Sequence, residues 1–237
     1  MSRAAPVRAW PPVTAIRWND THRLIPASYA DTDAPFVEEL TDQPDDVALL
    51  IDLMSATNAR LRAQADALPG GIRRDELVFA VPHWRIVNAA FCYPHPAGSR
   101  FSSPDRGAWY AARAVRTSLS EVAFHKQIEL AETKWWDLTI DYQDYLADIH
   151  GDLHDLRRAG DTKARACLSP TSYLKSQQVA TDLLEDEALG IVYPSVRDDG
   201  RNALACFRPA AVANVRAGAR YRLTWTGGSS HTTKRLA

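Results

Sequence analysis

The chain has 237 residues, of which 46% are hydrophobic and 24% charged, and its 28 basic and 29 acidic residues leave a formal net charge of −1. This length suits one large domain, and the composition is that of a folded globular protein. The charge balance lacks the basic surplus of nucleic-acid-binding proteins, so we expect no direct binding to DNA or RNA.

Two common targeting and redox features are missing from the sequence. No run approaches the ~20 apolar residues of a transmembrane helix, and residues 1–10 carry no apolar stretch behind their arginines. The cysteines Cys92, Cys167 and Cys206 are widely spaced and form no C-x-x-C pair, which argues against a zinc site or a disulfide framework. We therefore expect a cytoplasmic protein without membrane contact, whose thiols are buried small side chains.

The first third of the chain predicts little regular structure apart from one helix. Residues 1–35 are rich in proline, with a short strand at Ala15–Trp18. Pro44 suits a first helical position, and apolar residues then recur at three- and four-residue steps up to Pro69. This pattern predicts an amphipathic helix whose apolar face is core, at Val47, Leu50, Ile51, Met54 and Leu61.

The rest of the chain mixes short strands and helices. Composition and flanking turn residues predict strands at Leu77–Val81, Arg85–Tyr93, Ala108–Ala112, Trp135–Ile140, Ile191–Val196, Ala203–Phe207 and Tyr221–Trp225. Helices are predicted from Thr117 or Ser118 to Leu130, from Pro170 onward, and in part over the polar stretch Tyr145–Arg158. The turn Asp198-Asp199-Gly200-Arg201 joins two of the strands.

This order of elements predicts an α+β fold, because strands and helices do not alternate regularly as in a doubly wound sheet. We expect a compact mixed sheet with helices. The predicted division is an N-terminal extension over 1–75 packed on the core, a main domain over 76–226, and a mobile Gly/Ser/Thr-rich tail over 227–237.

Three segments carry candidate chemistry. The first is Gly98-Ser99-Arg100-Phe101, followed by Trp109-Tyr110-Ala111-Ala112. The second begins at Ser118 and contains Glu121 and His125. The third is Gly190-Ile191-Val192-Tyr193-Pro194-Ser195. Each segment alone is a weak signal, but their order and spacing together form a specific pattern.

This pattern resembles the RES domain, which is named after an arginine, a glutamate and a serine. Arg100, Tyr110, Glu121 and Ser195 match the family's functional positions, over roughly residues 80–226. The chain departs from the family in having Ser99 where many relatives have glycine and Ser118 where alanine is usual. The resemblance implies a fold like that of the ADP-ribosyltransferase toxins. It also implies a toxin of a bacterial toxin–antitoxin pair that consumes NAD+ as a substrate, needs no cofactor, and is restrained by an antitoxin protein over its active site.

The four residues suit cleavage of the nicotinamide–ribose bond. Nicotinamide is a cationic leaving group, and its departure leaves an oxocarbenium-like ribose that a carboxylate such as Glu121 stabilises. Glu121 is placed in the first turn of its helix, where the dipole favours ionisation. Arg100 can bind the pyrophosphate, Tyr110 can stack on the pyridinium, and Ser195 can bond the ribose or the nicotinamide amide. Further candidate NAD+ contacts are Arg17, Arg197 and His125.

Each of these residues also has a structural interpretation. Ser118 and Glu121 have the spacing of a helix capping box. Arg100 can be a surface residue, Tyr110 a core strand residue, and Ser195 a turn serine. His150 and His154 stand one helical turn apart near Asp148 and Asp152, which is metal-ligand spacing, although a solvated helix face explains it better and we expect no metal site.

Several functions therefore stay open. The ADP-ribose acceptor is phosphate, water or a protein side chain, and the N-terminal extension offers a surface for a protein substrate. The alternative is an inactive module of the same fold that only binds an antitoxin or another protein. A zinc hydrolase built on His150 and His154 is a more distant alternative.

Overall fold

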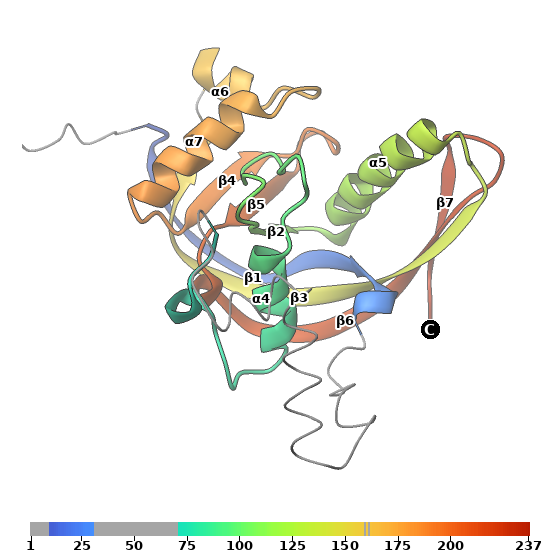
Figure 1. The fold of residues 1–237 in the computed structure, drawn as a ribbon, viewed down its shortest axis with the longest axis horizontal. Helices are drawn as coiled ribbons and strands as arrows, with labels where there is room; N and C mark the ends of the chain where they lie inside the picture. The colour runs from blue at the N-terminus through green and yellow to red at the C-terminus, as the bar shows by residue number, and fades with distance from the viewer. Residues whose placement is uncertain (1–9, 31–70, 159, 161) are drawn as a thin grey trace, which may run out of the picture.

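The computed structural model describes residues 10–30, 71–158, 160 and 162–237, which form one mixed β-sheet with helices packed on it (Figure 1). The strands are β1 (Val13–Pro26), β2 (Trp109–Ala112), β3 (Leu138–Asp155), β4 (Gly190–Pro194), β5 (Asn202–Cys206), β6 (Val212–Trp225) and β7 (His231–Arg235). The α-helices are α4 (Trp84–Cys92), α5 (Val115–Thr133), α6 (Thr162–Cys167) and α7 (Leu174–Glu185). Short 3-10 turns are η1 (Ala27–Tyr29), η2 (Arg74–Glu76) and η3 (Pro209–Ala211). The α+β prediction is confirmed.

The sheet runs in the order β1-β2-β5-β4-β3-β6-β7, and β1 also pairs with β3. The pairings β1–β2, β2–β5, β5–β4, β4–β3 and β3–β1 therefore close into a ring. Among the strands of the described residues, only the β3–β4 pair is parallel. Beyond the ring, β6 and β7 extend the sheet as antiparallel neighbours of β3.

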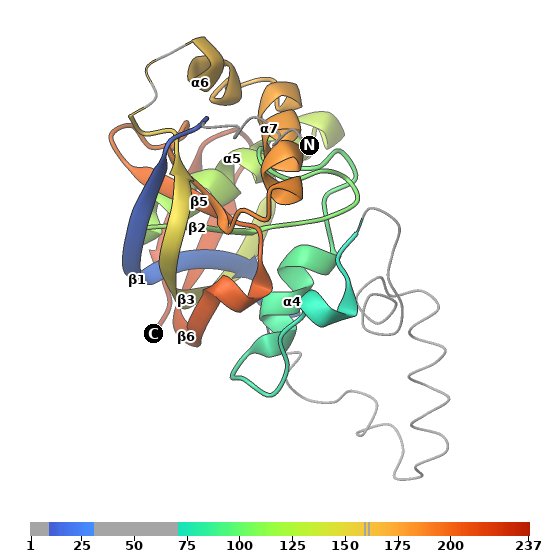
Figure 2. The ribbon, with the colours of Figure 1, turned by 90° about the vertical axis from the view of Figure 1, so that its left-hand side faces the viewer.

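Helices cover the sheet on two sides (Figures 1 and 2). α5 and the α6–α7 pair lie on one side, each over its own apolar cluster, and α4 lies on the other side. The largest cluster joins α4 to the sheet through Phe91, Trp109, Ile149 and Leu153. No helix in the described ranges is long and apolar enough to cross a membrane.

The long strands β1 and β3 form the centre of the sheet, side by side in Figure 2. β3 extends to Asp155, so the prediction of a partly helical stretch over Tyr145–Arg158 is wrong. The buried residues Tyr145, Ala147, Ile149 and Leu153 recur at multiples of two, which is the period of a strand with one face in the core. The Asp and His residues between them obscure this period, because they occupy the other face.

The strand predicted at Arg85–Tyr93 is the helix α4, and that prediction is wrong. Ile86, Val87, Ala90 and Phe91 are all buried and share one helical face, at steps of one, three and four residues. The β-branched and aromatic composition suggested a strand, but burial on one helical face outweighs local propensity. Leu77–Val81 likewise lies outside every described strand.

Other predicted elements are present with shifted ends. β2, β4, β5, α5 and α7 occur where they were predicted, and β1 and β6 extend the strands expected at Ala15–Trp18 and Tyr221–Trp225. The predicted turn joins β4 to β5: the Arg201 N–H donates to the Asp198 carbonyl at 3.1 Å, and Gly200 takes a φ of 73°.

The two ends of the chain differ from their predicted roles. β1 is an integral strand of the sheet rather than an extension packed on it, since it pairs with β3 from Val13 to Pro26. The segment expected to be a mobile tail contains β7, which pairs with β6 over five residues, so that prediction is wrong. The helix predicted after Pro44 lies outside the described residues.

A partly buried ion cluster connects η2 to the sheet. Arg106 donates two hydrogen bonds to the Glu76 carboxylate, at 2.8 and 2.7 Å, and Arg208 donates a third at 2.7 Å. Arg106 also donates to the Phe207 carbonyl at 2.9 Å, next to the end of β5. Burial alone would raise the pKa of Glu76, but the two guanidinium groups lower this pKa from 4.5 to about 2.

Replacing Glu76 with Gln is therefore expected to lower the free energy of unfolding by about 2–3 kcal/mol at neutral pH, because charged hydrogen bonds are lost and two guanidinium groups lose their counter-ion. The carboxylate stabilises the fold fully above its ordinary pKa of 4.5, and this contribution disappears as the pH falls toward 2. The free energies of unfolding of the two proteins, measured in urea, should therefore converge as the pH falls from 4.5 toward 2. Asp75→Asn, at the neighbouring exposed pair with Arg73, is the control and should change stability little. Equal stabilities at pH 7 would contradict this role.

Candidate active site

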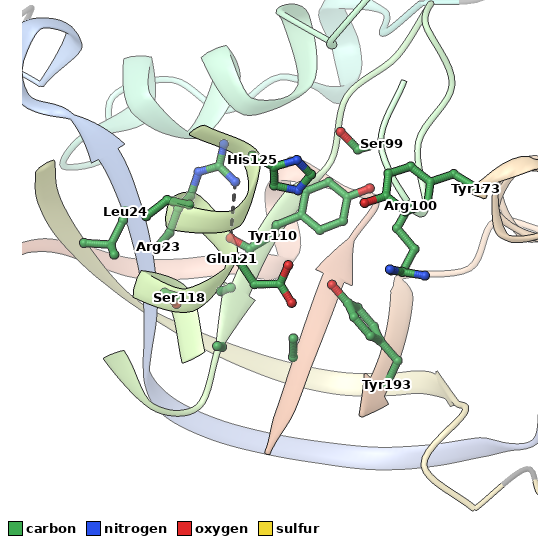
Figure 3. Close-up of a pocket in the computed structure, with 14 residues that line it drawn as sticks. Arg23, Leu24, Ser99, Arg100, Tyr110, Ser118, Glu121, His125, Tyr173 and Tyr193 are labelled. Carbon is green, nitrogen blue, oxygen red and sulfur yellow. Dashed lines mark hydrogen bonds between the residues drawn. The ribbon is translucent and has the colours of Figure 1, made fainter. Parts of the chain in front are cut away.

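A pocket of about 210 Å³ opens between β1, β2 and α5 (Figure 3). α5 presents Glu121, with Ser118 one turn before it and His125 one turn after it. The loop before β2 contributes Arg100, and β2 contributes Tyr110. The remaining lining residues are Arg23, Leu24, Ser99, Ala111, Ala112, Val122, Tyr173, Tyr193 and Ala203. The structure therefore brings together three of the four residues predicted as catalytic within one cavity.

Glu121 lies in the second turn of its helix, not in the first. α5 begins at Val115 with Ala114 as its N-cap, and it has no acidic residue in its first turn. The capping box that was the alternative interpretation of Ser118 and Glu121 is absent, because the Ser118 hydroxyl donates to the carbonyl of His22 at 2.7 Å instead. Burial raises the pKa of Glu121, against the opposing effects of a bond from Ser195 and of the Arg100 and Arg197 charges. The expectation that the helix dipole favours ionisation of Glu121 is therefore not met, because the carboxyl lies beyond the first turn.

Ser195 touches Glu121 directly from the end of β4. Its hydroxyl donates to Glu121 Oε1 at 3.0 Å, and its oxygen accepts the N–H groups of Arg197 and Asp198, both at 3.1 Å. A hydroxyl has one proton and two lone pairs, so all its hydrogen-bonding capacity is used. Ser195 is also not among the lining residues of the pocket within the described chain.

Arg100 is held by a tight loop. Gly98 has a φ of 69°, and a side chain there would collide with the Ser102 carbonyl oxygen. Arg100 itself is 7% exposed, and its Nη1 donates to the carbonyls of Cys167 at 3.1 Å and Ser169 at 2.8 Å. Its guanidinium carbon stands 4.7 Å from the ring centroid of Tyr173. These contacts fix the guanidinium in place without neutralising it.

Tyr110 supports the same loop. Its phenol oxygen accepts the Phe101 N–H at 2.8 Å, and it lies 3.2 Å from the Ser102 hydroxyl. Burial raises the pKa of this phenol to about 12, so it stays protonated at neutral pH. The hydroxyl is therefore structural, whereas the ring forms part of the pocket wall.

Arg23 on β1 is a pocket residue that sequence reasoning missed. Its Nη1 donates to the Tyr110 carbonyl at 3.2 Å, and its guanidinium lies 4.9 Å from the Trp109 ring centroid. Its Nε is buried without a hydrogen-bond partner. Burial lowers the pKa of Arg23 to about 10, so the group is still charged at pH 7. No carboxylate of the described residues forms an ion pair with either Arg23 or Arg100.

Arg17, the arginine predicted on this strand, is exposed and does not line the pocket in the described structure. A register shift between Trp18 and Thr21 interrupts the alternation of faces along β1. The face of the sheet that Arg17 occupies therefore does not predict the face that Arg23 occupies. No local feature of the sequence identifies Arg23 as a pocket residue.

Two more predicted residues lie near Glu121 in different ways. His125 is exposed and lines the pocket. Arg197 is not among the lining residues of the described chain; its guanidinium stacks 3.3 Å from the ring centroid of Phe124 and donates to the Pro170 carbonyl at 2.7 Å. Tyr193 lines the pocket from β4 and was not predicted as a site residue. Burial raises the pKa of its phenol well above 10, and the Glu121 charge adds to this effect. Its position two residues before Ser195 was the signal in the sequence that could have identified it.

The two histidines with metal-ligand spacing lie on the strand β3, not on a helix. His150 bonds Asn19 at 2.7 Å, and His154 bonds the Pro11 carbonyl at 2.6 Å. Across the described ranges, no group of three or more His, Cys, Asp or Glu side chains is placed to hold a metal ion.

Comparison with known proteins identifies a family. The family described as "RES domain" matches residues 77–226, more than half of the chain. No curated protein matches it in sequence. Among solved structures, the crystal structure of the M. tuberculosis MbcT-MbcA toxin-antitoxin complex is similar, at 14% identity over 89% of this chain and 87% of that one, with a TM-score of 0.45.

Proposed function

The chain belongs to the RES domain family, and on that premise we propose that it cleaves the nicotinamide–ribose bond of NAD+ and transfers the ADP-ribose. The observation that carries the proposal is the placement of one carboxylate between two guanidinium groups without acidic partners in the described chain. Figure 3 shows Arg23 and Arg100 on either side of Glu121. This arrangement suits a ligand that combines an anionic diphosphate with a cationic reacting end.

Glu121 would act on the reacting ribose. When the pyridinium leaves as neutral nicotinamide, positive charge passes to the ribose carbon and its ring oxygen. A carboxylate in a partly desolvated pocket stabilises that charge more strongly than it would in water. Because the leaving group needs no proton, no general acid is required beside Glu121.

The arginines would bind the diphosphate. Arg100 is already fixed by two backbone carbonyls, so little side-chain entropy is lost when it binds an anion. Arg23 lines the pocket and donates Nη1 to the Tyr110 carbonyl, and its charged guanidinium can attract a phosphate oxygen. The pocket volume of about 210 Å³ suits one end of a dinucleotide rather than all of it.

The aromatic wall would hold the nicotinamide. The rings of Tyr110 and Tyr193 both line the pocket around Glu121, and an electron-rich ring face attracts a cationic pyridinium. We revise the role of Ser195 from a ligand of NAD+ to a residue that holds Glu121, since its hydroxyl has no free donor or acceptor.

An enzyme that consumes NAD+ needs a restraint in its host, and the family resemblance suggests an antitoxin partner. We propose that the chain is the toxin of such a pair and that the antitoxin covers this pocket. The uncompensated charge of Arg23 and Arg100 favours a carboxylate-bearing segment that takes the position of the NAD+ phosphates.

Incubation of the purified protein with NAD+, with and without inorganic phosphate, tests the proposed reaction. We expect nicotinamide release, with the second product read by mass spectrometry: ADP-ribose-1″-phosphate if phosphate is the acceptor, free ADP-ribose if water is, and a mass-shifted protein if a side chain is. Glu121→Gln is the control for contaminating activity. A folded wild-type protein that releases no more nicotinamide than this control would contradict the proposal and favour the inactive binding module.

A further inference from the structure

We propose that Asp198 and Thr117 are positioning residues for Glu121, acting through the hydroxyl of Ser195. The inference rests on the proposed function only in taking Glu121 as the working carboxylate. It goes beyond that function by assigning roles to two residues outside the pocket lining and outside the Arg–Tyr–Glu–Ser pattern.

The four residues form a closed ring of contacts between α5 and the β4–β5 turn. The Thr117 hydroxyl donates to Asp198 Oδ2 at 2.8 Å, and the Asp198 backbone N–H donates to Ser195 Oγ at 3.1 Å. Ser195 Oγ then donates to Glu121 Oε1 at 3.0 Å. Glu121 follows Thr117 by one helical turn, so the helix itself closes the ring.

Because its side chains are buried, the ring is restricted to one arrangement of hydrogen bonds. Thr117 is fully buried, and Asp198 and Ser195 are 4% and 6% exposed. A buried carboxylate oxygen without a donor is costly, and the Thr117 hydroxyl supplies the donor for Asp198 Oδ2. Its other oxygen meets the exposed Arg116 at 3.1 Å, which compensates the charge from the surface.

The ring fixes the direction of the Ser195 proton. Because two backbone N–H groups occupy the lone pairs of Ser195, its proton has Glu121 Oε1 as its acceptor. If the turn moved away from α5, this bond would lengthen and the Glu121 carboxylate would gain rotational freedom. A displacement of this size near a reacting centre reduces rate substantially.

If Asp198 had a purely structural role, it would only anchor the β4–β5 turn and would not affect Glu121. A positioning role affects the protonation of Glu121, because the Ser195 bond lowers the pKa of this carboxyl whereas burial raises it. Loss of the ring should therefore move the acid limb of the pH–rate profile to higher pH. The substitution replaces none of the other charged or titratable groups around Glu121, which are Arg23, Arg100, Tyr110, His125, Tyr173, Tyr193 and Arg197.

Thr117→Val tests the ring, since valine has nearly the shape of threonine without its hydroxyl. We expect kcat for NAD+ consumption to fall roughly 10- to 100-fold, with the acid limb shifted to higher pH, and Thr117→Ser to restore both. Thr133→Val is the matched control at the exposed end of the same helix and should change neither. In a Ser195→Ala background, Thr117→Val should cause no further shift, because the path through Ser195 is already broken.

A direct titration of Glu121 by carbon-13 NMR separates this inference from the proposed function, because it does not require turnover. A higher Glu121 pKa in Thr117→Val supports the ring even if the wild type releases no nicotinamide, which would overturn only the proposed function. An unchanged pKa, or a full additional shift in the Ser195→Ala background, would overturn the ring. If Thr117→Val does not fold, Asp198→Asn serves, with a smaller shift expected in the same direction because an amide oxygen is a weaker acceptor.

Discussion

Replacing Glu121 with Gln should reduce NAD+ turnover at least ~100-fold, which is the scale of losing one preorganised electrostatic contact. Glutamine keeps the shape of the side chain, and its amide oxygen can still accept the Ser195 proton at the Oε1 position. Only the negative charge beside the ribose is lost. The measurement is the rate of nicotinamide release at saturating NAD+, and in bacteria the same variant should relieve growth arrest.

The Glu121→Gln substitution should not lower the stability of the protein, although it lowers turnover. Because burial raises the pKa of Glu121, its ionised form costs folding free energy above its ordinary pKa of 4.5, and this cost is absent at lower pH. We therefore expect Glu121→Gln to have an unchanged or higher Tm at pH 7. Glu129→Gln, an exposed carboxylate on α5, is the control and should retain turnover. Near-normal turnover of a stable Glu121→Gln protein would show that Glu121 serves only the fold.

Replacing Arg100 with Lys should raise the Kd for NAD+ at least ~10-fold, equivalent to about 1.4 kcal/mol, although the charge is kept. The guanidinium uses Nη1 to hold the Cys167 and Ser169 carbonyls and keeps its other nitrogens for a ligand. A lysine ammonium carries its three donors on one atom, so it cannot hold both carbonyls and still offer the ligand a planar pair of N–H groups. Calorimetry in the Glu121→Gln background avoids turnover during the measurement.

Two further substitutions sharpen this test. Arg23→Lys should weaken NAD+ binding in the same way, because β1 supplies the second guanidinium of the pocket. Arg165→Lys, on the exposed face of α6, is the matched control and should leave the Kd unchanged. Wild-type affinity in both Arg100→Lys and Arg23→Lys would mean that neither arginine contacts the phosphates.

The sequence by itself determined the local parts of the site. Arg100, Tyr110 and Glu121 were predicted from the resemblance of their motifs to the RES domain, and the structure places all three at one pocket. They follow one another within 22 residues of chain, through a loop, β2 and the start of α5, so a linear pattern contains their arrangement. The turn after Ser195 was predicted for the same reason, since Asp and Gly preferences act over four residues.

The tertiary structure alone decided what depends on contacts between distant segments. Arg23 enters the pocket because β1 lies beside β2, and it bonds a carbonyl 87 positions away. Ser195 bonds Glu121 across 74 positions, and on this contact we propose that it supports the carboxylate rather than contacting NAD+. The part of β3 from Tyr145 onward and the helix α4 were wrongly predicted, because burial against far strands overrode their local composition. The sequence thus indicated the candidate groups, whereas non-local pairing decided which of them line the pocket and which bond to Glu121 from outside it.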